Sequence, residues 1–446
     1  MKSLPKGSKK LLNAWAFYDW ANSVYSLVIA STIFPIFYAA LTIVKDEEGK
    51  VVHDTVQLLG FDFNNDSLIS YVTAMAFMLV AVISPFLSGI ADYVGNKKNF
   101  LKFFCYLGAL SCIGLFWFNL ENLIFGLGCY FLALVGFWAS LVFYNSYLPD
   151  IAFPNQQDRV SAKGFSLGYI GSVILLVICL LLVLNYEWFG FESEAMPTRL
   201  SFVLTGIWWI GFSQITYYYL PKGNKKEKLT RDVLFNGYKE IRMIWRSFDN
   251  NLQLKRYLTA FFIYSMAVQT VMLIATYFGI EEVNWTGQDA TTGLIVSILL
   301  IQLVAVAGAT ITSRLSSKMG NIETLILVNV LWIGICIYAF FVKTPLQFYI
   351  AAGLVGLVMG GIQTLSRSTY SKMLPKDTLD TTSYFSFYDV SEKIGIVIGM
   401  LLYGMVAQVF GSIRYSILFI TAFFLVGVFL LLKVPRTGKL AKKEAA

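Results

Sequence analysis

The chain is 446 residues long, 57% hydrophobic and only 14% charged, with a mean hydropathy of +0.64. Soluble domains average roughly 25% charged residues, so this composition excludes an ordinary water-soluble fold. The net charge of +8 does not indicate nucleic-acid binding, because basic loops beside an anionic membrane leaflet produce the same excess.

Apolar runs of about 20 residues, the length that a helix needs to cross a bilayer, recur along the whole chain. They predict an all-α integral membrane protein with twelve transmembrane helices. The first run holds Asp19 and Asn22 and is too long for a signal peptide, so we count it as the first helix. The predicted helices cover residues 14–41, 67–91, 99–119, 122–148, 162–184, 200–220, 257–279, 289–313, 323–342, 346–373, 382–410 and 413–433.

The distribution of basic residues predicts the orientation, because Lys and Arg concentrate on the cytoplasmic side of membrane proteins. With both termini inside, 28 of the 35 Lys and Arg residues lie in or beside cytoplasmic segments, 5 lie in outer segments and 2 lie within helices. We therefore predict cytoplasmic termini. The short loops favour a bacterial inner membrane.

The longest predicted connection, residues 221–256, divides the chain into an N-terminal six-helix bundle (1–220) and a C-terminal bundle with a tail (257–446). This linker holds ten basic residues. Its apolar residues recur at helical spacing opposite basic ones, which predicts an amphipathic helix on the inner membrane face; the alternative is a solvated linker. The apolar set is Leu234, Tyr238, Ile241, Trp245 and Phe248, and the basic set is Lys239, Arg242 and Arg246.

The two bundles resemble each other in sequence. SGIADYVGNKKNFL (88–101) aligns with SRLSSKMGNIETLI (313–326) at an offset of 225 residues, and Leu148-Pro149 matches Leu374-Pro375 at an offset of 226. Nearly equal offsets at equivalent positions indicate an internal repeat. Two parallel six-helix repeats around a midplane site are typical of one large class of transporters.

This layout resembles the major facilitator superfamily, and DYVGNKK (92–98) resembles the loop signature of that superfamily, acid–basic–x–Gly–basic–basic. The resemblance implies the major facilitator fold. We expect the loop to act as a conformational latch, pinned by ion pairing against neighbouring helix ends. Four residues keep the signature: Asp92, Gly95, Lys97 and Lys98. Three positions depart from it: Ser88, Tyr93 and Asn96.

A second resemblance is to the bacterial relatives of the autophagy-related vacuolar amino-acid effluxers. It is carried by FYDWANSVY (17–25), YNSYLPDIA (144–152), GYIGSVILL (168–176) and GGIQTLSRSTYSKMLP (360–375). These motifs are spread over both bundles. The resemblance implies solute transport, with amino acids or other small metabolites as the favoured substrates.

Five ionisable residues lie well inside predicted helices, all in the inner half of the membrane: Asp19, Arg367, Asp389, Glu392 and Lys393. A charge that faces lipid costs at least about 2.5–3.5 kcal/mol, so these side chains should face the interior and one another. Asp389 and Lys393 lie four residues apart on one helix and can pair. The fold resembled places helices one and ten around a central cavity, so Asp19 and Arg367 form the expected pair between repeats. That pair would either contact substrate or clamp an inner gate, and both alternatives stay open.

Three acids against two bases leave one carboxylate in excess, and Glu392 is the one without an obvious partner. A desolvated, unpaired carboxyl group tends to hold a proton near neutral pH. We therefore interpret Asp389, Glu392 and Lys393 as a candidate ion-coupling group. The alternative is a structural glutamate that is permanently protonated or bonded to water.

Uncharged polar residues extend the candidate site. Asn22, Ser23 and Ser26 follow Asp19 on one helical face, and Tyr25 lies one position off it. Many such groups only join helices by hydrogen bonds. They are concentrated on helices one, seven and ten, however, and the resemblance to the major facilitator superfamily implies that these helices line the cavity. Asn145 is expected to cap or gate. The candidates for substrate binding or gating are Asp19, Asn22, Tyr25, Gln269, Gln363, Ser366 and Arg367.

We predict a secondary active transporter that moves a small polar metabolite, an amino acid or similar, by alternating access, with proton coupling as an open possibility. The alternative is a facilitator, without ion coupling, for another solute class such as a peptide, a sugar or a drug-like compound. No catalytic cluster, metal-ligand group or phosphate-binding loop is evident, so we expect no enzyme, cofactor or metal. The expected partners are the solute, the bilayer and in the coupled case H⁺, with the chain working as a monomer.

Overall fold

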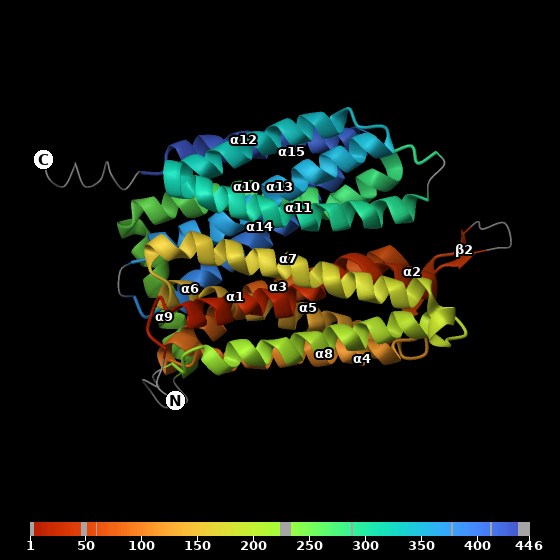
Figure 1. Cartoon of the computed structure of the whole chain (residues 1–446), viewed down its shortest axis with the longest axis horizontal. Helices are drawn as coiled ribbons and strands as arrows, with labels where there is room; N and C mark the ends of the chain where they lie inside the picture. Colours follow the sequence, from red (N-terminus) through yellow and green to blue (C-terminus); the bar gives the residue numbers. More distant parts are fainter. Residues whose placement is uncertain are drawn as a thin grey trace, which may run out of the picture.

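A computed structural model of the chain describes residues 4–45, 51–58, 60–223, 233–286, 289–375, 378–410 and 413–435. Long helices run side by side along the longest axis of the molecule (Figure 1). We call the end where α1 (Lys9–Val24) starts the terminal end. The last described residues lie at that end too, because Gln253 at the start of α10 (Leu252–Glu282) donates a hydrogen bond to the carbonyl of Pro435.

The opposite end carries two small antiparallel strand pairs, and we call it the hairpin end (Figure 1). The strands lie between the first and second long helices, in a segment that the sequence analysis left as a loop. In the first pair Val44 lies opposite His53, and in the second Thr55 lies opposite Asn64. The strands are β1 (Val44–Lys45), β2 (Val51–His53), β3 (Thr55–Leu58) and β4 (Phe61–Asn64).

Helices that precede the linker form the first half of the molecule, and those that follow it form the second half. After α1, the first half contains η1 (Tyr25–Ile33), α2 (Phe34–Thr42), α3 (Asn65–Val94), α4 (Lys97–Gly114), η2 (Leu115–Trp117), α5 (Leu123–Asn145), α6 (Leu148–Ile151), α7 (Pro154–Leu184), η3 (Tyr186–Phe189) and α8 (Ala195–Tyr219). The linker helix is α9 (Val233–Asn250). After α10, the second half contains α11 (Ala290–Met319), α12 (Asn321–Phe340), α13 (Pro345–Met373), α14 (Thr381–Phe410) and α15 (Ile413–Leu432).

The helices bear out the predicted twelve-helix layout. In the described part of the chain, eleven helices are long and apolar enough to cross a membrane. The twelfth is α8, which has 25 residues but carries Arg199, Gln214 and several Ser and Thr residues. The predicted fifth helix began at residue 162, whereas α7 begins at Pro154. The apolar run stops short of the polar residues 154–161, but the helix includes them, and two of their side chains, Asp158 and Ser161, are bonded to helices of the second half.

The internal repeat is visible in the helix lengths and turns. Helices α3 and α11 each have 30 residues, and both start at the hairpin end. Gly95 follows the first with φ 69° and Gly320 follows the second with φ 98°. Only glycine adopts such a positive φ without strain, so both halves place a glycine at the equivalent turn between two membrane helices.

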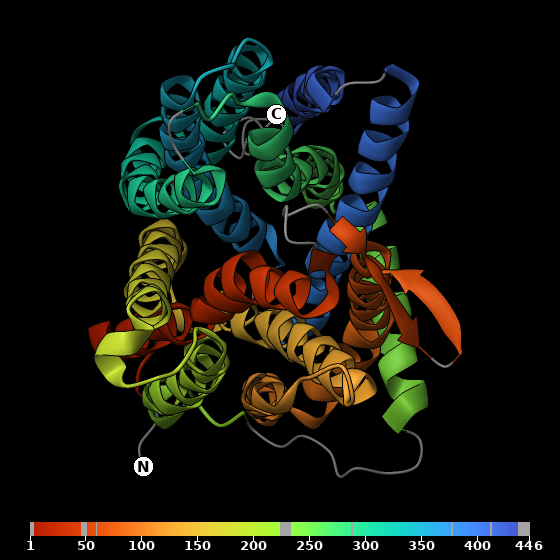
Figure 2. The same ribbon diagram turned by 90° about the vertical axis from the view of Figure 1, so that its right-hand side faces the viewer.

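Buried apolar side chains form two main clusters, one in each half. In Figure 2 the ribbons of the first half, red to yellow-green, lie mostly below those of the second half, blue-green to blue. The first runs from Leu11 to Leu220. The second runs from Ile244 to Val434 and takes only Tyr169 from the first half. We propose on this basis that residues 1–220 and 257–446 are two separately packed bundles joined by the linker 221–256.

The linker forms a helix where we predicted one, but its faces differ from the expectation. Phe248 is buried against the rings of Tyr384 and Phe387 of α14, and it faces protein where we expected the membrane surface. Trp245 is 65% exposed, and the basic residues Lys239, Arg242 and Arg246 are also exposed. Hydrophobic spacing identifies an apolar face without telling whether lipid or protein covers it. The side chains of Leu234, Tyr238 and Ile241 lie outside the described residues.

Candidate functional site

A cavity of about 370 Å³ lies between the two halves. The first half contributes residues from α1, η1, α3, α5 and α7 to its wall, and the second half contributes residues from α10, α11, α13 and α14. Asp19, Asn145 and Arg367 line it nearest the terminal end, whereas Ser31, Thr73 and Tyr130 line it toward the hairpin end. A space with walls from both repeats is where a transporter of this layout holds its solute.

The predicted contact between Asp19 and Arg367 is present, with Nη2 of the arginine 3.2 Å from Oδ2 of the aspartate. Both side chains are at least 95% buried. We call these two residues the gate pair. Nη1 donates a second bond to Asp19 and one to Asn145, Nε donates to the Ser161 hydroxyl, and Nη2 donates to the Ser161 carbonyl. These contacts occupy all five N–H groups of the guanidinium.

Aromatic rings enclose the gate pair. The guanidinium carbon of Arg367 lies 4.1 Å from the centre of the Phe165 ring and 4.9 Å from that of Trp15. Tyr144 donates a hydrogen bond of 2.9 Å to Asp19. Rings stabilise a cation through their negative faces and exclude water, so the ion pair sits in a low-dielectric environment.

The close passage of α7 past this pair depends on glycine. A Cβ added at Gly164 would lie 2.3 Å from Oδ2 of Asp19 and 3.1 Å from Nη2 of Arg367. One turn further on, a Cβ at Gly168 would lie 2.5 Å from the Ser23 hydroxyl. Small residues let transmembrane helices approach closely, so these glycines set the distance between α1 and α7.

A second buried charge cluster, which we call the triad, consists of Asp389, Glu392 and Lys393 on α14. Nζ of Lys393 lies 2.9 Å from Asp389 and 3.0 Å from Glu392, and it also sits 3.7 Å from the centre of the Trp138 ring of α5. Gln269 of α10 donates a 2.7 Å hydrogen bond to Glu392. Our expectation that Glu392 lacks a partner is therefore wrong, because Lys393 lies between both carboxylates and Gln269 reaches across from another helix.

The uncharged candidates divide into two groups. Asn22, Gln269, Gln363 and Ser366 line the cavity, as do Ser23 and Ser26. Tyr25 does not: it is 1% exposed and its ring packs against Phe137 and Trp209 inside the first half. Its position one residue off the polar face turns its side chain into the core of the bundle.

The first membrane helix is π-helical from Tyr25 to Ile33, a feature that the sequence analysis missed. This segment carries Ser26, Ala30 and Ser31 into the cavity wall, and both serines are exposed. Wide helical turns of this kind are rare and occur often at functional sites. These serines extend the polar wall of the cavity toward the hairpin end.

Several residues in the cavity wall gave no signal in the sequence. Tyr169 donates a 2.7 Å hydrogen bond to Gln363 across the two halves, and Trp138 covers Lys393. Both lie in apolar runs, where an aromatic residue is predicted to be part of the hydrophobic core. Thr73, Tyr130, Gln302 and Tyr388 line the same space.

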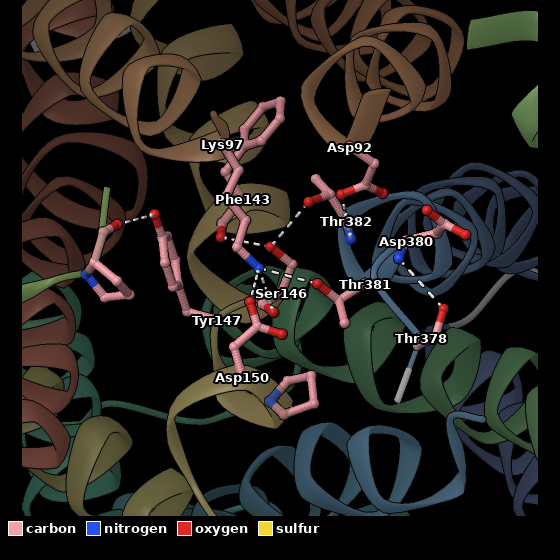
Figure 3. Close-up of polar contacts among 12 residues, drawn as sticks. Asp92, Lys97, Phe143, Ser146, Tyr147, Asp150, Thr378, Asp380, Thr381 and Thr382 are labelled. Atoms are coloured by element: carbon pink, nitrogen blue, oxygen red, sulfur yellow. Dashed lines mark hydrogen bonds and ion pairs between the residues drawn. The ribbon is translucent and has the colours of Figure 1, made fainter. Parts of the chain in front are cut away.

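The loop predicted as a latch joins the two halves at the terminal end (Figure 3). Asp92 accepts backbone hydrogen bonds of 3.3 and 2.7 Å from Thr382 and Ser383, in the first turn of α14. Those N–H groups have no partner within the helix and carry its positive dipole, so a carboxylate stabilises them. We call this contact the first latch.

Lysines complete the first latch. Lys97 forms an ion pair of 2.5 Å with Asp150 and donates to the Thr381 hydroxyl across the interface. Lys98 donates to the carbonyl of Leu220 at the end of α8, and Gly95 makes the turn between α3 and α4. Figure 3 shows Lys97 and Asp92 on opposite sides of the Thr381–Thr382 segment.

A second latch, absent from the sequence-based predictions, lies at the pseudosymmetric position. Asp158 at the start of α7 accepts from Lys372 at 2.6 Å, from Asn321 at 2.9 Å and from the Ser316 hydroxyl at 3.1 Å. Here the acid belongs to the helix start, the reverse of the first latch, and its donors come from the α11–α12 turn (Ser316 and Asn321) and from the end of α13 (Lys372). Sequence analysis placed residue 158 in a loop, so its burial was not foreseen.

Hydrogen bonds between the two halves therefore gather at the terminal end. The gate pair and both latches lie there, and the Ser161 hydroxyl adds a bond to the carbonyl of Thr364. The cavity extends from this closed end toward the hairpin end. Among the described residues, side-chain bonds between the two halves thus close the terminal end, whereas Ser31, Thr73 and Tyr130 line the cavity toward the hairpin end.

Comparison with known proteins agrees with this architecture. Residues 7–445 match the family described as vacuole effluxer Atg22 like. The chain belongs to this family. An MFS-type transporter of Bacillus subtilis (strain 168), YxiO, is 30% identical over 95% of this chain and 94% of its own. Autophagy-related protein 22 of Eremothecium gossypii is 25% identical over 97% of this chain and 92% of its own.

Solved structures similar to this Atg22-like chain are major facilitator superfamily transporters. The fucose transporter FucP in its outward conformation superposes with a TM-score of 0.66 at 14% identity, covering 96% of this chain and 99% of FucP. The proton:xylose symporter XylE gives a TM-score of 0.69 at 11% identity, with 96% and 95% covered. Such low identities show the fold alone. The predicted family and twelve-helix fold are confirmed, and the protein is a multi-pass membrane protein, an MFS-type transporter.

Proposed function

We propose that this Atg22-like transporter is a secondary active transporter that carries a small polar metabolite, an amino acid or similar, by alternating access. The observation that carries the proposal is the asymmetry of the interface between the halves. A cavity lined by Asn22, Gln269 and Gln363 is accessible at one end, while the gate pair closes the other. Rocking of the halves about such a site would expose it to each side in turn.

The gate pair is better suited to gating than to holding the solute. All five N–H groups of Arg367 are bonded to protein in this conformation, so none is left for a ligand. Opening of the terminal end must separate Arg367 on α13 from Asp19 on α1. We therefore assign the pair to the gate and the cavity walls to the solute.

The orientation of the transporter follows from its basic residues. Both termini and α9 are placed on the cytoplasmic side of a bacterial inner membrane, because 28 of 35 Lys and Arg residues lie at that side. In this orientation the structure is outward-facing, with its inner gate closed. We expect the transporter to work as a monomer, since each chain contains a complete cavity.

Proton coupling is assigned to the triad. Two carboxylates share one lysine, so a single proton would make the cluster electrically neutral. One oxygen of Asp389, Oδ2, has no hydrogen-bond partner among the described residues. A proton bound there or on Glu392 changes the energy of one conformation relative to the other, which is the condition for coupling.

A facilitator without ion coupling remains the second candidate, and one observation favours it. Glu392 and Asp389 are both bonded to Lys393, an arrangement that also serves as a purely structural cross-link. Such a protein would still close its gate in the same way. Only the response to a pH gradient distinguishes it.

Solute counterflow tests the proposed function. The purified protein is reconstituted in vesicles preloaded with a single unlabelled compound, and exchange of the labelled compound is measured for amino acids, small peptides and sugars. We expect exchange of at least one amino acid, and empty vesicles serve as the control. Exchange confined to sugars or peptides would contradict the assigned substrate class.

A further inference from the structure

Both cations beside the cavity are fully used by the protein. Arg367 donates its five N–H groups to Asp19, Asn145 and Ser161. Lys393 contacts Asp389, Glu392 and the face of the Trp138 ring, which occupies the three directions of an ammonium group. Neither has a donor left for a negatively charged ligand.

The available charge in the cavity wall is the carboxylate of Glu392. Its side chain is 19% exposed, compared with 7% for Asp389 and 1% for Lys393, and it lines the cavity together with Gln269. A carboxylate has about four acceptor positions. The contacts with Lys393 and Gln269 use two of them, so Glu392 can accept from a ligand as well.

Aromatic rings form much of the remaining wall. Phe137, Trp138 and Phe165 come from the first half, and Phe261, Tyr264 and Tyr388 come from the second. Ring faces attract cationic nitrogen and also pack against apolar groups. A wall of this kind suits a ligand that combines a positive charge with an apolar body.

We propose that the transported solute carries a cationic nitrogen, such as a protonated amine, which binds beside Glu392 while an apolar body packs against the aromatic wall. A solute whose only charge is negative is excluded. The proposal rests on the proposed transport function and narrows its substrate class. An amino acid satisfies it through its ammonium group, with neutral donors such as Asn22 left for the carboxylate.

The exclusion of anions follows from the same contacts. An anion would need Arg367 or Lys393 as its counter-ion, and either would have to leave a buried carboxylate behind. Removing one partner of a buried ion pair leaves an uncompensated charge in a low dielectric, which is strongly unfavourable. A cation meets no such obstacle, because Glu392 is already partly exposed to the cavity.

Charged thiol reagents can measure the preference of the cavity for cations over anions, and this test does not require the solute to be known. The five cysteines are buried and are first replaced by alanine or serine. A single cysteine then replaces Ser26 in the cavity wall, and a matched one replaces Trp188, which is 82% exposed at the hairpin end. The reagents are a trimethylammonium-ethyl and a sulfonato-ethyl methanethiosulfonate, added to the purified protein.

We expect the ratio of cationic to anionic modification rates to be roughly tenfold higher at position 26 than at position 188. The substitution Glu392→Gln should lower the ratio at position 26 several-fold and leave position 188 unchanged. Equal ratios at the two positions in the chain with its native charges would overturn the proposal, whether or not the Glu392 variant folds.

A matched set of ligands provides an independent readout. Thermal unfolding of the purified protein is followed with 2-phenylethylamine, phenylalanine and 3-phenylpropionate, which share one ring and differ in charge. We expect the amine or the amino acid to raise the melting temperature and the acid to have no effect. A larger shift with the acid would overturn the inference. Binding of the amine without counterflow of any solute would refute the transport function and leave Glu392 and the aromatic wall as a binding site for a cationic ligand.

Discussion

Arg367 in the second half of the molecule holds Asp19 in the first, and its guanidinium has no N–H group left over for anything else. This contact joins residues 348 positions apart in the sequence. It lies at the closed end of the cavity, so in the proposed alternating-access cycle this contact has to break before the terminal end can open. The arrangement explains how an apolar first helix can keep a carboxylate: its charge is compensated from the opposite repeat.

Neutralising either partner of the gate pair should be more harmful than neutralising both. Asp19→Asn or Arg367→Gln alone leaves a buried charge without a counter-ion, at a cost of about 3–5 kcal/mol. The double variant carries no such charge and should recover folded protein. Thermal unfolding of the three purified variants tests this. A decrease in melting temperature of the double variant that equals the sum of the two single decreases would show that the two residues do not interact.

Gly164→Ala should weaken the gate without changing any charge. The added Cβ would lie 2.3 Å from the Asp19 carboxylate, so α7 or the ion pair must move, at a cost of about 1–3 kcal/mol. Gly211→Ala on α8 is the matched control, because a Cβ there meets nothing within 4 Å. We expect a lower melting temperature for the first variant only. Equal melting temperatures of the two variants would argue against the close approach of α7 to Asp19.

Loss of either latch should favour opening of the terminal end. Asp92→Asn and Asp158→Asn each remove charge-assisted hydrogen bonds that are worth about 1.5–3 kcal/mol apiece. The outward-facing population should fall, and with it the modification rate of a cysteine at Ser26. Asp249→Asn provides the control, since the pair of Asp249 with Lys255 is exposed and contributes little. An unchanged rate in both latch variants would rule out a gating role.

Labelling from the two sides of the membrane tests the orientation. Single cysteines at Arg242 on α9 and at Trp188 in η3 are both exposed. In intact cells an impermeant reagent should label position 188 and leave position 242 unlabelled until the membrane is opened. Labelling of both positions from outside would contradict the assigned orientation.

Glu392→Gln should uncouple transport from the proton gradient. The amide imitates the protonated carboxyl, so an imposed pH gradient should no longer stimulate uptake. Exchange between loaded vesicles needs no net proton movement, so it should fall only as far as the loss of the Glu392 charge weakens solute binding. Asp389→Asn differs, because Lys393 then loses its i+4 partner and folding should suffer. A Glu392→Gln protein that still responds fully to the gradient would leave the facilitator as the better description.

The sequence was sufficient for the features that depend on local pattern. Runs of apolar residues located the twelve helices. The cost of a charge in lipid predicted that Asp19 and Arg367 face the interior, and the resemblance to the major facilitator fold predicted that they pair. The partner of Glu392 could not be found this way. Gln269 lies 123 residues away on another helix, and a neutral amide in an apolar run carries no signal of what it faces.

Tyr25 and Asp158 show two further limits of prediction from the sequence. A tyrosine beside a polar stripe can point into the cavity or into the core, and a π-helical segment that starts at that residue shifts which way it turns. Asp158 precedes the apolar run of its helix and therefore resembled a loop residue. Its three partners lie on α11, α12 and α13. Only the assembled fold therefore shows that Asp158 is buried and bonded to the second half.

The position of α9 has a kinetic consequence for the transporter. This helix packs along α3 of the first half, while Ile244 and Phe248 belong to the core of the second half. In the proposed alternating-access cycle, opening of the terminal end separates α3 from α14, so α9 has to give up its contacts with α3 or with the second half. These contacts of α9 are thus part of the activation barrier. Sequence changes in the linker, far from the cavity, can alter turnover while leaving solute affinity unaffected.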